Sequence, residues 1–388
     1  MFGLYIVSLL ALLLPKAVLS SPCLAFDASF NLLVFGLDGH DWSVGTQDTW
    51  ATGNLGTPTD ITTTGRPPFD AANTTCYLSQ FYNAIYVLSG DSANPSDVHI
   101  YNAAKKTWFA QTTTVGTYDP ASAVAILDHD TNVFYAYSKG ELFFLDMGAL
   151  VAANSTALDW VDAKAASFNT VGYQPVMALA QNHIHFLDVP GTPAGSADIF
   201  VIHFSYFQPE AQAYSGPTFP ATHGQATSFF QTTGVQQEFA FIPDDGSSTY
   251  VINVETNTTQ ALAGPSTKDA SSTYFAGITS LVQLTSDGTV SYLPYKQGDT
   301  QANQAATWTK ISSISAAVAA LPPSSSASPT STGKAGSTAS NGPFNAKPTG
   351  SGVGSIGSGS STSAAVASRP VTGVLLMASA LGLMALLL

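Results

Sequence analysis

Short apolar runs, rather than long helical repeats, set the pattern of the central part of the chain. Between about residue 27 and residue 321, runs rich in Val, Ile, Phe, Tyr and Thr alternate with turns rich in Gly, Asn, Asp and Pro. No long stretch repeats with the 3.6-residue period of an amphipathic helix. Short runs bounded by turn residues predict β-strands, so this part of the chain is predicted to be all-β.

The runs recur at a nearly constant interval. Six of them follow a polar turn, and their first residues lie 52, 49, 50, 56 and 50 positions apart: Leu32–Leu37, Ala84–Ser89, Val133–Ser138, His183–Asp188, Phe239–Pro243 and Thr289–Pro294. A residue that is aromatic in five of six cases trails each run: Trp50, Trp108, Trp160, Tyr214, Leu262 and Trp308. A period near 50 residues is the length at which four antiparallel strands form one propeller blade. The sequence therefore predicts a β-propeller of four-stranded antiparallel blades, six-bladed in preference to seven-bladed.

A run of small and apolar residues precedes every marker run except the first: Cys76–Gln80, Ser122–Leu127, Pro175–Ala180, Ala226–Gln231 and Thr279–Leu284. Such runs suit the innermost strand, where blades crowd the axis. Only Asp27–Phe30 precede the first marker run, whereas Ala316–Leu321 resembles Ser122–Leu127. We therefore predict that a C-terminal strand completes blade 1 and closes the ring, which would remove exposed sheet edges. The alternative is that Ala316–Leu321 begins the segment that follows.

Blade 2 carries the clearest single unit. The strand and turn glycine of Ala84–Gly90 are followed by Asp97–Asn102 and then by Thr107-Trp108. This unit resembles a kelch repeat, although the Gly-Gly pair of that family is reduced to Gly90. The resemblance implies a kelch-like propeller. Fungal extracellular members include copper radical oxidases, whose Tyr–Cys thioether requires a free cysteine.

Both ends of the chain are apolar. Residues 2–15 are followed by Val18-Leu19-Ser20, which fits cleavage after Ser20, so residues 1–20 are predicted to be a secretory signal peptide. An uncleaved membrane anchor is the alternative, but the run falls short of the roughly 20 residues that span a bilayer.

The C-terminal part of the chain is predicted to be a stalk followed by an anchor signal. Residues 322–360 are dominated by Ser, Gly, Ala, Thr and Pro and cannot bury a core, so they are predicted to be a disordered stalk. Residues 361–388 combine a polar spacer with an apolar tail, the pattern of a removed glycosylphosphatidylinositol (GPI) signal. The candidate anchor residues are Ser358, Gly359 and Ser360. A transmembrane helix is the alternative.

Sequons and cysteines fit the same route. Glycosylation is predicted at Asn73, Asn154 and Asn257, each followed by a hydroxyl residue two positions later. The two cysteines, Cys23 and Cys76, are predicted to form a disulfide in an oxidising compartment, with two free thiols as the alternative. A pair leaves no cysteine for the oxidase thioether. The predicted location is the extracellular face of the plasma membrane, with the cell wall as the alternative, and the membrane is reached only through the lipid.

The charge distribution limits the partners. All 25 acidic residues lie between Asp27 and Asp299 with only seven basic ones, which leaves 18 net negative charges. This field disfavours nucleic acid and anionic lipid, although acidity also simply maintains solubility. Cell-wall glycan or another surface protein is the expected partner of a monomeric chain.

Candidate chemistry is sparse. The turns Asp38-Gly39-His40-Asp41 and Asp128-His129-Asp130 place carboxylates beside an imidazole, but Asp also forms turns for backbone reasons. His183 and His185 alternate on one strand and His203 lies on the next, which would allow a metal site or three interior histidines. We expect no cofactor and no metal, and no catalytic residue is identified. The expected function is non-catalytic adhesion, sensing or glycan binding; the alternative is a wall-modifying glycoside hydrolase or lyase.

Overall fold

The computed structural model describes residues 21–50 and 56–321. These residues belong to one compact unit, Met1–Ser325. The predicted signal peptide, stalk and GPI signal, with its candidate anchor residues, lie outside the described residues. Within those ranges, no helix has the length and apolar character needed to cross a bilayer.

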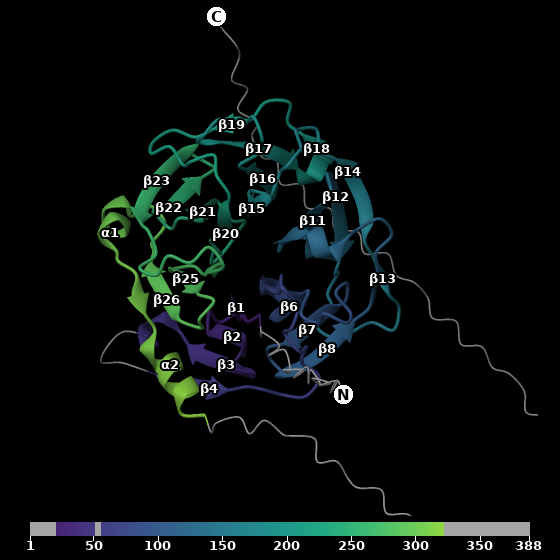
Figure 1. The fold of residues 1–388 in the computed structure, drawn as a ribbon, viewed down its shortest axis with the longest axis vertical. Coiled ribbons are helices and arrows are strands. Elements are labelled where there is room, and N and C mark those ends of the chain that lie inside the picture. The colour runs from purple at the N-terminus through teal and green to yellow at the C-terminus, as the bar shows by residue number, and fades with distance from the viewer. Residues whose placement is uncertain (1–20, 51–55, 322–388) are drawn as a thin grey trace, which may run out of the picture. The chain divides into compact units, whose positions relative to one another are not determined.

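Six antiparallel sheets stand in a ring, which confirms the predicted six-bladed β-propeller (Figure 1). Each blade is a meander whose first strand lies nearest the axis. In chain order the blades consist of β1 (Cys23–Phe26), β2 (Leu32–Leu37), β3 (His40–Gly45) and β4 (Thr59–Asp60); β5 (Thr75–Ser79), β6 (Ala84–Leu88), β7 (Val98–Asn102) and β8 (Thr107–Gln111); β10 (Val124–Asp128), β11 (Val133–Ser138), β12 (Glu141–Asp146) and β14 (Val161–Ala165); β15 (Val176–Ala180), β16 (His183–Leu187) and β17 (Ser196–Val201) with β18 (Tyr206–Phe207) and β19 (Gln212–Ala213); β20 (Gly224–Ser228), β21 (Glu238–Pro243), β22 (Ser248–Asn253) and β23 (Thr258–Ala263); and β24 (Thr273–Ala276), β25 (Ser280–Leu284), β26 (Val290–Pro294) and β27 (Thr309–Lys310). Between blades 2 and 3, β9 (Thr113–Thr114) pairs with β13 (Leu158–Asp159) in parallel.

The repeating runs are the second strands of blades 1 to 5, as the period implied. In blade 6 the assignment is shifted, because Thr289–Pro294 corresponds to the third strand, β26, and Thr279–Leu284 to the second, β25. The inner strand β24 lies upstream, joined to β25 by a tight turn. Second and third strands are both apolar here, so a constant interval does not distinguish them.

The prediction that a C-terminal strand closes the ring is wrong. β1 is the inner strand of blade 1 and pairs with β2 from Cys23↔Phe35 to Phe26↔Leu32. The C-terminal segment instead forms α2 (Ser312–Ala319), consistent with the high helix propensity of its alanines. Ile314 is fully buried as α2 packs beside β3 and β26 (Figure 1). A second short helix, α1 (Thr300–Ala305), lies in the β26–β27 connection.

Aromatic side chains fill the boundaries between blades. Across the junction of blades 6 and 1, Phe26 lies 6.0 Å from Phe275 and Trp50 lies 5.2 Å from Tyr292, measured between ring centroids. Five of the trailing residues are aromatic, and all six are buried. These residues therefore belong to the packed core of the propeller.

The predicted disulfide is confirmed. Cys23 on β1 is bonded to Cys76 on β5, so the bond joins the inner strands of blades 1 and 2. Both cysteines are buried, and the described residues contain no free cysteine. The bond anchors the first strand of the ring to the next blade.

Candidate functional site

A cavity of about 990 Å³ lies inside the ring, and we call it the cup. Its wall is formed by five inner strands, β5, β10, β15, β20 and β24, together with Ser21 and Pro22 ahead of β1. The residues immediately before each inner strand also line it. We call the side of the ring where the inner strands begin the cup face.

The cup is lined by neutral groups. Among the described residues that line it there is no Asp, Glu, Lys or Arg. The polar side chains are amides, hydroxyls and a single imidazole; they include Asn73, Thr75, Gln174, Gln225, Gln236, Ser272 and His223. The inner strands are also the edges of their sheets, so their outer backbone N–H and C=O groups face the cup. The wall therefore offers both hydrogen-bond donors and acceptors without charge.

Some of these backbone groups are capped by the neighbouring blade. The Ser228 hydroxyl accepts a hydrogen bond from Leu179 N–H of blade 4, and the Thr227 hydroxyl accepts one from Ala276 N–H of blade 6, both at 3.1 Å. Adjacent residues of a strand point to opposite sides, which is why Thr227 and Ser228 reach opposite neighbours. These two hydrogen bonds link blade 5 to blade 4 and to blade 6 along the wall of the cup.

The far end of the cup is closed by the loop between β20 and β21, residues Phe229–Gln237, which we call the plug. Phe230 forms its centre. The ring of Phe230 stacks on Phe275 of blade 6 at 6.0 Å and meets Phe30 of blade 1 at 6.2 Å and His129 of blade 3 at 5.7 Å. Phe230 also lines the cup, so it forms part of the floor.

Backbone groups of the plug bind the remaining blades. Gln80 of blade 2 donates its side-chain N–H to Gln231 O at 3.2 Å, and Gln181 N–H of blade 4 donates to Gln236 O at 2.7 Å. The plug therefore contacts all five other blades.

The rim of the cup carries charge that its wall lacks. His223 lines the cup and its Nδ1 lies 2.8 Å from the Asp244 carboxylate. Burial is the main cause that raises the pKa of nearby Asp188, and Asp244 adds to the shift while His223 opposes it. On the neighbouring blade, the hydrogen bond from Lys139 lowers the pKa of Asp119.

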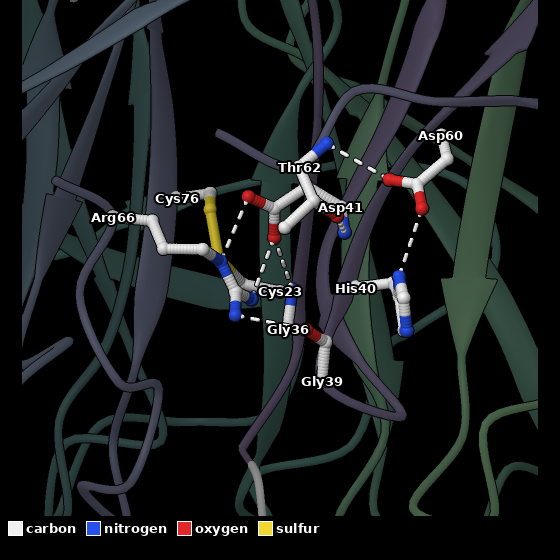
Figure 2. Close-up of polar contacts among 9 residues, drawn as sticks. All are labelled: Cys23, Gly36, Gly39, His40, Asp41, Asp60, Thr62, Arg66 and Cys76. Atoms are coloured by element: carbon white, nitrogen blue, oxygen red, sulfur yellow. Dashed lines mark hydrogen bonds and ion pairs between the residues drawn. A yellow bond between two sulfur atoms is a disulfide. The ribbon is translucent and has the colours of Figure 1, made fainter. Parts of the chain in front are cut away.

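The Asp38–Asp41 cluster lies outside the cup and is structural. Figure 2 shows the polar contacts of His40 and Asp41. Buried Asp41 accepts hydrogen bonds from Gly36 N–H at 2.9 Å and from two nitrogens of Arg66 at 2.8 and 3.0 Å. Arg66 also donates to Gly39 O at 2.9 Å. The β2–β3 register shifts at this point, and Asp41 satisfies the backbone that the irregularity frees. His40 pairs separately with Asp60 at 2.8 Å.

The second acidic cluster lies behind the plug. His129 is buried between Phe81, stacked at 5.8 Å, and Phe230. Its Nε2 lies 3.3 Å from Asp130, and Asp128 accepts a hydrogen bond from the Thr131 hydroxyl. Burial lowers the pKa of His129 and raises that of Asp128, so both environments favour the neutral form.

The three histidines of blade 4 have separate partners. His183 pairs with Gln181 O, His185 Nδ1 shares a hydrogen bond of 2.9 Å with the Tyr214 hydroxyl, and His203 pairs with Asn182. His203 lies in a 3₁₀ turn after β17, not on a strand. Within residues 21–50 and 56–321, no three His, Cys, Asp or Glu side chains come together as metal ligands.

All three sequon asparagines are exposed. Asn73 precedes β5 and lines the cup. Asn154 and Asn257 lie in connections between third and fourth strands and do not line the cup; Asn154 N–H donates to Gln111 Oε1, at the end of β8.

Sequence reasoning missed the plug and the cup amides. Gln174, Gln225 and Gln236 belong to no motif. The plug did leave a trace, since the 56-residue interval between His183 and Phe239 is the longest of the five. Comparison with known proteins adds no relative, because neither a protein-family model nor a curated protein matches this chain.

Proposed function

We propose that this chain is a non-catalytic, extracellular propeller whose cup binds a neutral, polyhydroxylated ligand such as a cell-wall glycan, in adhesion or sensing. The single observation that carries the proposal is the uncharged, hydrogen-bonding wall inside an otherwise acidic protein. Sugar hydroxyls both donate and accept hydrogen bonds, as do the amides and strand edges of the cup. An ionic ligand would find no counter-charge on this wall.

The dimensions agree with a small glycan. Ligand pockets commonly measure roughly 300–1,000 Å³, so the cup, at about 990 Å³, lies at the upper end of that range. Tyr173 and Tyr274 add aromatic surface to the wall. We infer a short oligosaccharide rather than a single sugar.

A glycoside hydrolase is the less supported alternative. Most such enzymes place two carboxylates roughly 5–10 Å apart on either side of the scissile bond. The described lining of the cup contains no carboxylate, and Asp188 and Asp244 are associated only with its rim. Binding without turnover fits this arrangement better.

Surface display is part of the same proposal. The buried disulfide and the exposed positions of all three sequons are compatible with passage through an oxidising secretory compartment. GPI anchoring, the kelch-like and fungal assignments, and a monomeric state are proposed on the sequence patterns alone.

Glycan-array binding by residues 21–321 tests the proposal. We expect binding to neutral glycans without hydrolysis. Gln174→Ala and Gln225→Ala each remove one cup amide, and loss of one hydrogen bond of about 0.5–1.5 kcal/mol weakens binding roughly two- to tenfold. Gln301→Ala on α1, exposed and outside the cup, is the matched control. Equal affinities of the cup and control variants, or release of cleaved sugar, would contradict the proposal.

A further inference from the structure

Asn73 stands at the lip of the cup. Its exposed side chain lines the cavity, and Nδ2 donates a long hydrogen bond of 3.5 Å to Ala121 O, in the segment that leads into blade 3. The same side chain therefore belongs to a sequon and to the rim, at the boundary between blades 2 and 3. Asn154 and Asn257 do not line the cup.

We propose that an N-linked glycan on Asn73 covers the mouth of the cup and restricts entry to small ligands. This inference rests on the secretory route and the cup of the proposed function. Its geometry is specific to Asn73, because the other two sequon asparagines do not line the cup.

The modification is compatible with the hydrogen bond at this site. In N-glycosylation the sugar–phosphate bond of a lipid-linked diphosphate oligosaccharide breaks, C1 of the sugar bonds to Nδ2, and Nδ2 loses one hydrogen as a proton. The linked amide keeps one N–H, which remains able to donate to Ala121 O. That bond would hold the first sugar at the boundary between the two blades, beside the opening.

The test measures access to the cup without a natural ligand. The full chain is produced through a eukaryotic secretory pathway carrying Gln225→Cys, a cup position on blade 5 across the ring from blade 2 (Figure 1). Glycopeptide mass spectrometry measures occupancy at Asn73. The thiol is then labelled with N-ethylmaleimide and, in a separate reaction, with a polyethylene glycol maleimide of about 5 kDa, which is chosen to be larger than the cup. Lys105→Cys, exposed on the plug side, reports the intrinsic rates of both reagents.

Removal of the sequon supplies the comparison. We expect the large reagent to label Gln225→Cys on the order of tenfold more slowly when Asn73 is glycosylated, a difference of about 1.4 kcal/mol in the barrier. Asn73→Gln and Thr75→Ala, two independent ways to remove this glycan, should restore the rate, whereas Asn154→Gln and Asn257→Gln should not. N-ethylmaleimide should react equally in all of them.

Two results would overturn the inference: an unoccupied Asn73, or equal labelling by the large reagent with and without the glycan. Neither depends on what the cup binds. A negative glycan array together with slow labelling by the large reagent would instead count against the proposed function, and it would still support the inference that the Asn73 glycan covers the cup.

Discussion

His185 should make the stability of the propeller fall in mild acid. The side chain is buried on β16, and burial, with a smaller contribution from His183, lowers the pKa of His185 from 6.5 to about 3. Between these values the folded state keeps the imidazole neutral while the unfolded chain binds a proton. The contribution of His185 to stability is therefore constant above about pH 6.5 and falls by about 1.4 kcal/mol per pH unit below it. At about pH 5 this single group should cost about 2 kcal/mol.

Denaturant unfolding of residues 21–321, followed by tryptophan fluorescence between about pH 7 and about pH 5, measures this effect. His185→Phe should flatten the pH dependence by about 2 kcal/mol relative to the wild type over that interval. Other groups, including buried His129, titrate in both proteins and cancel in the difference. The control is Tyr214→Phe, which removes the hydrogen bond to His185 but not its burial. This control should lower stability by about 1 kcal/mol at every pH and keep the wild-type slope. Parallel pH curves for the wild type and His185→Phe would refute the reasoning.

Two further predictions concern the links that hold blade 1. Replacing both Cys23 and Cys76 with Ser opens a crosslink with a sequence separation of 53, which in the chain-entropy account lowers the free energy of unfolding by about 4 kcal/mol; an unchanged denaturation midpoint would contradict it. Arg66→Met leaves Asp41 as an uncompensated buried charge and should cost about 3 kcal/mol, and combining it with Asp41→Asn should recover part of that loss. The exposed Lys139→Met serves as the control for Arg66→Met and should change stability little. Additive losses in the Arg66–Asp41 double-mutant cycle would argue against their coupling.

The sequence predicted the ring because strand period and turn chemistry are local properties. The interval of about 50 residues identified the second strand in five blades. It could not reveal that the repeating run of blade 6 is the third strand instead of the second. Cys23–Phe26 lies next to the predicted cleavage site, so its four apolar residues were not recognised as a strand. Ala316–Leu321 resembled an inner strand in composition, but this segment continues α2, whose Ser313 and Ile314 are buried against the neighbouring blades, a contact that composition does not reveal.

The candidate site was less accessible from sequence for a physical reason. Motif searches look for charged and metal-binding residues, and the charged candidates turned out to support the backbone or to lie behind the plug. The cup is assembled from neutral residues of five blades and of the segment ahead of β1. The structural interpretation of Asp41 was available from its turn, but its ion pair with Arg66, 25 positions away, was not.

The plug has a consequence for polymeric ligands. Because Phe230 and its loop seal the axis from one side, a polysaccharide cannot thread through the disc, and whatever enters must withdraw along its own path. Only a chain terminus or a short branch can extend down to the floor, while the interior of a long polymer stays outside. Binding of a polysaccharide to this propeller would therefore depend on the number of chain ends and short branches rather than on the length of the chain.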